Sequence, residues 1–190
     1  MDFLIVITIS YLLGSIPFGL LLTKFFLNKD IRNIGSGNIG ATNVLRSGNK
    51  LIGYTTLIFD ILKGVIPIIY IKFNYADLIY ISSLSVFLGH VFPLWLKFKG
   101  GKGVATYVGI LFAINVIYGL FFGVIWILIF TISKYSSLSS LIASLSIPLY
   151  MYIFNEKQII FYVIMFVLIF YTHRENIKRL KNKEESKSKI

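Results

Sequence analysis

Long apolar segments alternate with short polar segments along most of this 190-residue chain. A transmembrane helix needs roughly 20 consecutive apolar residues, and most of the apolar segments approach or exceed that length. The last two are short, which is typical of shortened or tilted helices in a tight bundle. The segments that predict membrane-spanning helices are 3–27, 51–71, 78–96, 104–133, 138–154 and 158–172.

Segment 104–133 is too long to be one span. As a single helix its 30 residues would extend about 45 Å, whereas the hydrocarbon core is about 30 Å thick. A break near 115–119 gives two short spans and places 15 of the 19 lysines and arginines on one side of the membrane. The positive-inside rule therefore predicts seven helices, with the N-terminus outside and the C-terminus in the cytoplasm.

Three features inside the predicted spans allow further predictions. The Gly-Ser-Ile-Pro-Phe-Gly run at 14–19 predicts a kink with a small-residue face, and Pro148 predicts another kink. Asp60 and Lys63 are three residues apart, on one helical face inside a span. Such charges are costly unless they are paired or line water, so a structural ion pair and a catalytic pair both remain open.

Composition supports an integral membrane protein. The chain is 56% hydrophobic, with a mean hydropathy of +0.79. Its net charge of +11 fits basic cytoplasmic loops better than nucleic-acid binding. The absence of cysteine excludes disulfides, and no histidine spacing indicates a metal site, so neither metal nor cofactor is expected. With Asp2 before the first apolar segment and no cleavage site, that segment is interpreted as a retained helix and not a signal peptide.

The polar stretch 35–46 is the first candidate for chemistry. Its glycines, Gly35, Gly37 and Gly40, let backbone N–H groups approach an anion closely. Arg46 supplies a planar fork that suits phosphate oxygens, and the asparagines and hydroxyls of the stretch can orient the ligand. The alternative is a flexible loop that merely follows the positive-inside rule. The concentration of Gly, Asn and Arg favours a functional loop.

A second basic loop, 97–103, reads Lys-Phe-Lys-Gly-Gly-Lys-Gly and directly precedes a predicted helix. Free N–H groups at a helix N-terminus bind phosphate, although the spacing is not that of a Walker motif. Ordinary cytoplasmic lysines are the alternative interpretation.

The remaining polar candidates also fall at the cytoplasmic ends of spans. His90 either caps and packs there or binds substrate, and Ser137 can be an ordinary N-cap. His173 and Asn176, three residues apart, form either an interfacial anchor or a substrate-binding pair. All these clusters are expected on one side of the membrane, where they can form a single basic pocket open to water and to lipid.

Taken together, these motifs resemble the bacterial membrane-bound acyl-phosphate:glycerol-3-phosphate acyltransferases over nearly the whole chain. Each motif is weak alone, but their number and order make the resemblance specific. Lys134 is a departure, since the family tends to have arginine there. The segments that carry the resemblance are 14–19, 35–46, 60–64, 89–93, 98–106, 135–138 and 173–180.

The resemblance implies transfer of a fatty acyl group from acyl phosphate to the 1-hydroxyl of glycerol 3-phosphate, giving lysophosphatidate and phosphate in the first step of phospholipid synthesis. We expect one acyltransferase domain over 1–180, acting as a monomer in the bacterial plasma membrane with its site at the cytoplasmic face. The charged composition of 181–190 predicts a disordered cytoplasmic tail. The residues expected to be catalytic are Ser36, Asn38, Arg46, Lys102, His173 and Asn176. The residues expected to bind substrate are Gly37, Gly40, Asn43, His90, Gly100, Gly101, Gly103, Thr106 and Ser137.

A transporter of a small organic phosphate is the competing hypothesis. It would share the basic pocket but would need many polar residues at mid-membrane depth, and here these are nearly limited to Asp60, Lys63 and Asn115. The His-x4-Asp signature of acyl-CoA-type acyltransferases is absent, because Trp95 and Lys178 stand five residues after the two histidines. The proton acceptor stays open among His90, His173 and a phosphate oxygen of the substrate.

Overall fold

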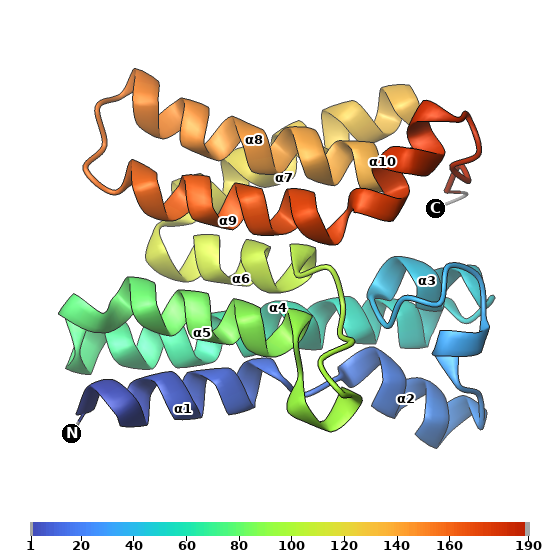
Figure 1. Cartoon of the computed structure of the whole chain (residues 1–190), viewed down its shortest axis with the longest axis horizontal. Coiled ribbons are helices and arrows are strands. Elements are labelled where there is room, and N and C mark those ends of the chain that lie inside the picture. Colours follow the sequence, from blue (N-terminus) through green and yellow to red (C-terminus); the bar gives the residue numbers. More distant parts are fainter. Residues whose placement is uncertain (1, 189–190) are drawn as a thin grey trace. The chain divides into compact units, whose positions relative to one another are not determined.

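The computed structural model describes residues 2–188, and this part of the chain is all-helical, as predicted (Figure 1). The chain divides into two compact units, Met1–Ile114 and Asn115–Ile190, which are described separately below. The first unit contains α1 (Asp2–Gly14), α2 (Phe18–Leu27), η1 (Ile31–Asn33), α3 (Ala41–Arg46), α4 (Lys50–Asn74), η2 (Ala76–Leu78), α5 (Ile79–Val91), η3 (Leu94–Leu96) and α6 (Val104–Ile114). The second contains α7 (Val116–Ser133), α8 (Ser136–Ile153), α9 (Ile159–Thr172) and α10 (Arg174–Lys181).

Five stretches of the described chain are long and apolar enough to cross a membrane, or six if α9 and α10 are taken as one bent span. α6 does not qualify: its 11 residues extend about 16 Å, roughly half of a hydrocarbon core of about 30 Å. The predicted break in segment 104–133 is confirmed, since α6 ends at Ile114 and α7 begins at Val116. The helix over 3–27 is interrupted at Ser15–Pro17, within the run predicted to kink.

Glycines let α1 and α5 of the first unit approach each other closely. A Cβ at Gly14 would collide with the carbonyl group of Val86, and one at Gly89 would collide with the carbonyl of Tyr11. The buried hydroxyls of Ser10 and Ser82 are 2.8 Å apart, a hydrogen bond between the same two helices. Small residues at a helix contact, joined by a polar pair, are the usual means of association inside a membrane.

α4 and α6 meet in the same way. A Cβ at Gly64 would collide with the Thr106 carbonyl, and one at Gly109 would collide with the Ile61 carbonyl. At the far end of α4, Lys72 donates hydrogen bonds to the carbonyls of Ala113 and Ile114, at 3.1 and 2.9 Å. A cation at a helix C-terminus is favourable, so Lys72 helps to end α6 at the break.

The contact between α4 and α6 makes a stability prediction. Gly109→Ala is expected to destabilise the protein by about 1–3 kcal/mol, because the added methyl meets backbone that cannot move aside. Thermal unfolding in detergent measures the change. Gly123→Ala in α7 is the matched control: nothing lies within 4 Å of its added Cβ, so better helix propensity should leave stability unchanged or raise it by up to about 1 kcal/mol. Equal effects of the two substitutions would contradict the close packing.

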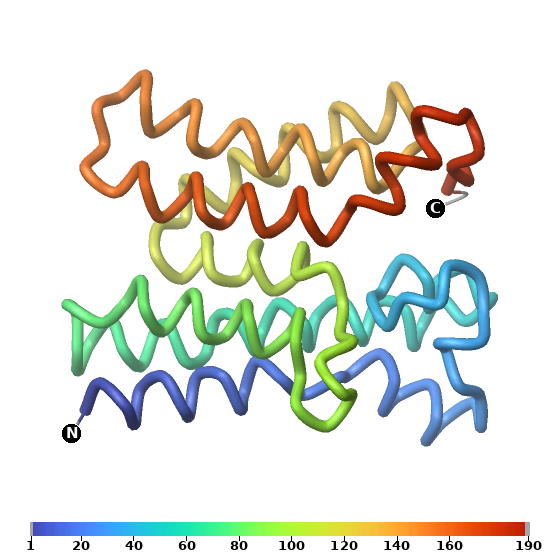
Figure 2. Tube along the Cα trace, viewed as in Figure 1, coloured from blue at the N-terminus to red at the C-terminus, as the bar shows by residue number. Residues whose placement is uncertain are grey.

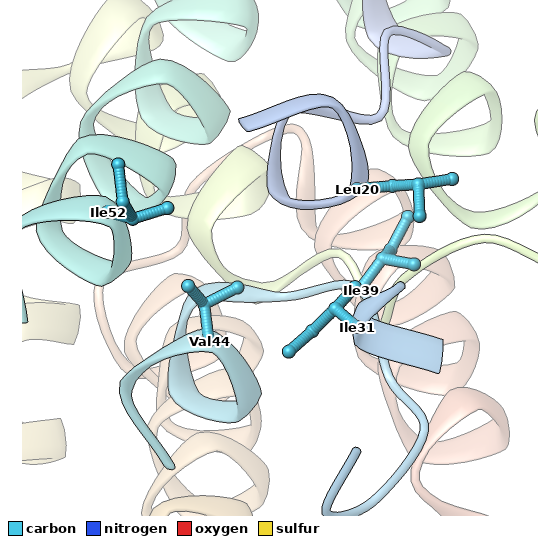
Figure 3. Packing of buried hydrophobic residues seen from close by; sticks show 5 residues of the cluster. All are labelled: Leu20, Ile31, Ile39, Val44 and Ile52. Atoms are coloured by element: carbon cyan, nitrogen blue, oxygen red, sulfur yellow. The ribbon is translucent and has the colours of Figure 1, made fainter. Parts of the chain in front are cut away.

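A small apolar cluster fixes the polar segment between α2 and α4. Figure 3 shows the side chains of Leu20, Ile31, Ile39, Val44 and Ile52 packed together, and all five are buried. They come from α2, η1, the loop after η1, α3 and α4. The glycine-rich loop at 35–40 is therefore held at both ends by hydrophobic contacts and is not a freely moving connection.

The second unit starts at the break. Asn115 is the N-cap of α7, with its side-chain oxygen accepting a hydrogen bond from the Ile117 N–H at 2.9 Å. α8 runs through Pro148 without interruption, and α10 is bent 61° from α9 at His173. The short α10 thus leaves the axis of the last apolar helix directly after Thr172 (Figure 1).

Candidate functional site

Asn43 organises the glycine-rich loop at 35–46. Its side-chain oxygen accepts a hydrogen bond from the Ser36 N–H at 2.9 Å. Its amide nitrogen lies 3.2, 2.9 and 2.8 Å from the carbonyl oxygens of Ile31, Ile34 and Asn38. The side chain is only 2% exposed. The structure therefore places Asn43 beneath the loop, with its hydrogen-bonding capacity used by the backbone.

The other predicted residues of this loop lie around that centre. Ser36 and Arg46 are exposed, and Asn38 is half-buried, with its Oδ1 accepting a hydrogen bond from the Gly40 N–H at 2.9 Å. Gly37 has φ +71°, in the left-handed region that favours glycine, and its N–H donates to the Ile34 carbonyl. Ser36, Asn38 and Arg46 are thus presented by a loop whose shape Asn43 and the glycines set.

Asp30, the N-cap of η1 before this loop, forms an exposed ion pair with Arg32. Its carboxylate accepts hydrogen bonds from the Arg32 backbone N–H and from the Arg32 guanidinium, the shortest at 2.6 Å. The Arg32 side-chain hydrogen bonds lower the pKa of Asp30 to about 2, so the carboxylate stays charged at neutral pH. The positive charge of Arg32 is therefore balanced by the neighbouring Asp30 carboxylate.

Asn43→Asp tests the role of Asn43. A carboxylate keeps the shape of the amide but has no N–H to donate, so it would face the three carbonyl oxygens without a hydrogen bond. We expect a loss of more than about 2 kcal/mol of stability in thermal unfolding. The control is Asn49→Asp, at the N-cap of α4, where aspartate caps equally well. Wild-type stability of Asn43→Asp would contradict the assignment.

The second loop, 97–103, lies directly on α5. The N–H groups of Gly100 and Gly101 donate to the carbonyls of Val91 and His90, at 3.0 and 3.1 Å. A Cβ at Gly101 would collide with the His90 ring, and one at Gly103 would collide with the Phe87 ring. The hypothesis of a phosphate loop built from all three glycine N–H groups is therefore not supported at Gly100 and Gly101, whose N–H groups already have backbone acceptors.

Lys102 is half-buried at the end of this loop, one residue before Gly103, which has φ +84° and precedes α6. His90 and Thr106 are placed deeper. The His90 side chain is 4% exposed, with its Nδ1 3.8 Å from Asp60 Oδ1, and Thr106 is fully buried in the first turn of α6. Of the three, Lys102 is the one nearest solvent.

In the second unit, Ser137 and Asn176 meet at one carboxylate. The Ser137 hydroxyl and the Asn176 amide donate to Glu185 Oε1, at 2.8 and 2.7 Å. Arg179 Nε donates to Glu185 Oε2 at 2.7 Å. The predicted site residues Ser137 and Asn176 are thus brought together by Glu185, which sequence analysis did not select.

The turn after α10 brings Glu185 back to these residues. The Lys183 N–H donates to the Leu180 carbonyl and the Glu184 N–H to the Arg179 carbonyl, with Lys183 at φ +61°. This pattern is the Schellman motif that commonly ends helices. Burial disfavours the charged form of Glu185, but hydrogen bonds from Arg179, Ser137 and Asn176 outweigh it and lower the pKa of this carboxyl.

His173 lies at the bend between α9 and α10 and is 2% exposed. Its Nδ1 is 2.8 Å from the Ile169 carbonyl oxygen, which can only accept a hydrogen bond. Nδ1 therefore carries the proton in the neutral ring, and the lone pair is on Nε2. That tautomer leaves Nε2 as the basic atom of His173.

The predicted residues thus form two sets, each within one unit. Ser36, Asn38, Arg46 and Lys102 belong to the first, while Ser137, His173 and Asn176 belong to the second. Over residues 2–188, no group of three or more His, Asp or Glu side chains is arranged to hold a metal ion. The first set offers hydrogen-bond donors and the cations Arg46 and Lys102, which suits anionic substrates. In the second set, the Ser137 hydroxyl and the Asn176 amide already donate to the Glu185 carboxylate.

Comparison with known proteins decides the family. The family model described as glycerol-3-phosphate acyltransferase matches residues 4–183. The chain belongs to the glycerol-3-phosphate acyltransferase family. The glycerol-3-phosphate acyltransferase of Pelagibacter ubique (strain HTCC1062) is 69% identical over 190 residues, covering 100% of both chains. That of Rhodopseudomonas palustris (strain HaA2) is 46% identical over 181 residues, covering 94% of this chain and 92% of the relative.

The fold of this acyltransferase is also that of a solved relative. The crystal structure of PlsY (YgiH), an integral membrane glycerol 3-phosphate acyltransferase, in its glycerol 3-phosphate form superimposes with a TM-score of 0.93 at 37% identity. The match covers 98% of this chain and 96% of that one. The lysophosphatidic acid form of PlsY gives a TM-score of 0.90 at 36% identity, with coverages of 98% and 95%. The predictions of the family and of a multi-pass integral membrane protein are confirmed, and the transporter alternative is not favoured.

Proposed function

We propose that this glycerol-3-phosphate acyltransferase takes its acyl group from acyl phosphate and attaches it to the 1-hydroxyl of glycerol 3-phosphate. A bond forms between the hydroxyl oxygen and the acyl carbonyl carbon, the bond from that carbon to the phosphate oxygen breaks, and the hydroxyl proton is released. The products are lysophosphatidate and inorganic phosphate. The observation that carries the proposal is the match over 98% of the chain to a glycerol 3-phosphate acyltransferase solved in its glycerol 3-phosphate form.

The residue types of the two sets fit this reaction. Acyl phosphate is already activated, because phosphate is a good leaving group, so no covalent enzyme intermediate is required. Two anions must come together, and their repulsion is costly unless cations screen it. Arg46 and Lys102 supply that charge on the first unit, and positioning of two reactants can contribute about 7–11 kcal/mol to catalysis. Ser36, Asn38, Ser137 and Asn176 supply groups that orient polar substrates.

The proton of the attacking hydroxyl needs an acceptor. The lone pair on His173 Nε2 supports His173 in this role, since its Nδ1 is already committed to the Ile169 carbonyl. His90 is less suited, because its ring lies between Asp60 and Gly101. A phosphate oxygen of the substrate is the remaining candidate.

We further propose that the chain crosses the bacterial plasma membrane seven times as a monomer, with its N-terminus outside. In this topology α6 is a shortened span, which local thinning of the bilayer accommodates, and α7 is a full span. The polar residues of each unit lie at the cytoplasmic face. The support is the distribution of charge: 15 of 19 basic residues then fall on the cytoplasmic side. Accessibility labelling of single cysteines tests it directly, because the chain has no cysteine of its own. Labelling of residues 46 and 102 from opposite sides would overturn it.

The donor is tested with purified protein and radiolabelled glycerol 3-phosphate. Palmitoyl phosphate, palmitoyl-CoA and palmitoyl-acyl carrier protein are supplied in parallel reactions, and label is measured in the organic phase. We expect lipid-soluble label with palmitoyl phosphate only. Equal transfer from palmitoyl-CoA would contradict the proposal that acyl phosphate is the donor. Uptake of label into vesicles without a lipid product would contradict the proposal of acyl transfer.

A further inference from the structure

Asp60 and Lys63 form an ion pair inside α4 that the mechanism above does not use. Lys63 Nζ is 2.7 Å from Asp60 Oδ1, and both side chains are 3% exposed. Charges inside a span are costly, and a buried ion pair is often no more stabilising than apolar residues of the same volume. The contacts that the two side chains make beyond each other therefore indicate what the pair does.

Lys63 is connected through a series of contacts to the loop at 35–46, the first of the two loops proposed to bind substrate. Its Nζ donates a hydrogen bond to the Ile16 carbonyl at 2.7 Å, in the interruption between α1 and α2. α2 starts two residues later, and a Cβ at Gly19 would collide with the Ile39 carbonyl. Leu20 also packs in the cluster of Figure 3. α2, whose start Lys63 contacts, is therefore one of the elements against which the loop at 35–46 packs.

Asp60 is connected through His90 to the loop at 97–103, the second loop proposed to bind substrate. Its Oδ1 faces His90 Nδ1 at 3.8 Å. Gly101 packs against the other side of that ring, and its N–H donates to the His90 carbonyl. Lys102 is the next residue along the chain. In the trace of Figure 2 the loop after α5 returns to α6 past the interruption between α1 and α2, and Trp95 Nε1 donates to the Ser15 carbonyl there at 2.8 Å.

We infer that Asp60 and Lys63 are positioning residues for acyl transfer, which together set the relative placement of the loops at 35–46 and 97–103. The inference rests on the proposed role of these loops in binding the substrates. Lys63 acts through Ile16 and α2, and Asp60 acts through His90 and Gly101. The pair neutralises its own charge, so the contact of Lys63 with the Ile16 carbonyl and that of Asp60 with the His90 ring can both exist inside the membrane.

Lys72, on the same helix, provides a comparison for Lys63. Its Nζ also donates to two backbone carbonyls, but the residue is exposed and the carbonyls belong to the C-terminus of α6. That contact lies at the end of α6 farther from the loop at 97–103. Lys72→Met is therefore a matched control for Lys63→Met, since both remove one ammonium and its hydrogen bonds from the same helix.

The kinetic experiment compares Asp60→Asn, Lys63→Met, the exchange Asp60→Lys/Lys63→Asp, and Lys72→Met, each assayed well below its own unfolding midpoint. A misplacement of about 1 Å can cost about 100-fold in rate, so kcat/KM for glycerol 3-phosphate should fall about 10- to 100-fold in the first two variants. The exchange variant should not recover, because an aspartate at position 63 cannot donate to the Ile16 carbonyl. Lys72→Met should stay within about 2-fold of wild type. Wild-type kinetics in the exchange variant would overturn the inference, since charge neutralisation alone would then suffice.

A second readout does not depend on activity. Spin labels on Asn33→Cys and Lys99→Cys, both exposed positions, report the distance between η1, directly before the loop at 35–46, and the loop at 97–103, in a chain without other cysteines. The distance distribution should broaden or shift in Asp60→Asn and Lys63→Met, and stay unchanged in Lys72→Met. Lost activity with an unchanged distribution would overturn the positioning role. If Lys63→Met does not fold, Asp60→Asn carries the test because it keeps side-chain volume. Failure of the proposed function would appear separately, as absent transfer by the wild type.

Discussion

Replacing Arg46 with alanine is expected to lower kcat/KM for acyl transfer by about 100- to 1,000-fold, the usual cost of removing a group that stabilises developing charge. The proposed reaction brings two phosphorylated substrates together, and Arg46 is the exposed arginine at the end of the loop that Asn43 shapes. The fold should remain intact, because the buried residues of α3 are Ala41, Asn43 and Val44. The measurement is steady-state transfer from palmitoyl phosphate, with the unfolding midpoint recorded for each variant.

Two further substitutions separate the charge of Arg46 from its shape. Lys50→Ala removes an exposed cation four residues away and should change kcat/KM by less than about 3-fold, since an exposed charge of this kind contributes little. Arg46→Lys keeps the charge but loses the planar fork, and an intermediate loss is expected. Near-normal turnover by purified Arg46→Ala would refute the role of Arg46. If Lys50→Ala lost as much kcat/KM, the effect of Arg46 would come from the general positive charge of this surface and not from a specific contact.

The pattern of apolar and polar segments predicted the helical architecture because each helix in a membrane must satisfy its backbone internally. It also predicted the break near Asn115, since charge placement and helix length point to the same position. The short α6 was harder to anticipate. Its length depends on Asn115 capping α7 and on Lys72, 43 positions earlier in the chain, binding the last carbonyls of α6.

The sequence indicates which loops hold the candidate residues, but not how each side chain in those loops is placed. A polar residue in a glycine-rich loop can face the ligand or the backbone beneath, and sequence does not distinguish Asn38 from Asn43. Likewise, Gly100 and Gly101 have the composition of a phosphate loop, yet their N–H groups bind the carbonyls of Val91 and His90. Which face of a loop is exposed depends on contacts with elements distant in sequence.

Glu185 was missed for a different reason. It belongs to a run of lysines, glutamates and serines whose composition is typical of disorder. The contact with Arg179 spans six positions and follows from the turn after α10, not from helical spacing. A polar partner for Ser137 and Asn176 is the signal that could have indicated it, because two buried donors need an acceptor.

Glu185→Leu is expected to remove acyl transfer almost completely and to destabilise the protein by about 3–5 kcal/mol, the usual cost of breaking a buried charge contact. The substitution leaves the Ser137 hydroxyl and the Asn176 amide buried without their shared acceptor, and it frees the Arg179 guanidinium. Ser137 and Asn176 then lose the contact that orients them. Thermal unfolding in detergent and transfer from palmitoyl phosphate measure the two effects.

Glu184→Gln is the matched control, because Glu184 is the exposed neighbour whose backbone N–H, and not its carboxylate, makes the contact to Arg179. The pH dependence gives a second check. Glu185 has a lowered pKa in the folded protein, so its stabilising contribution is complete above the unfolded pKa of about 4.3 and is lost as the pH falls through the lowered folded value. Wild type should therefore lose stability in this acid window more steeply than Glu185→Gln does. If wild type and Glu185→Gln lost the same amount of stability as the pH falls, the carboxylate of Glu185 would not be what holds Ser137 and Asn176 in place.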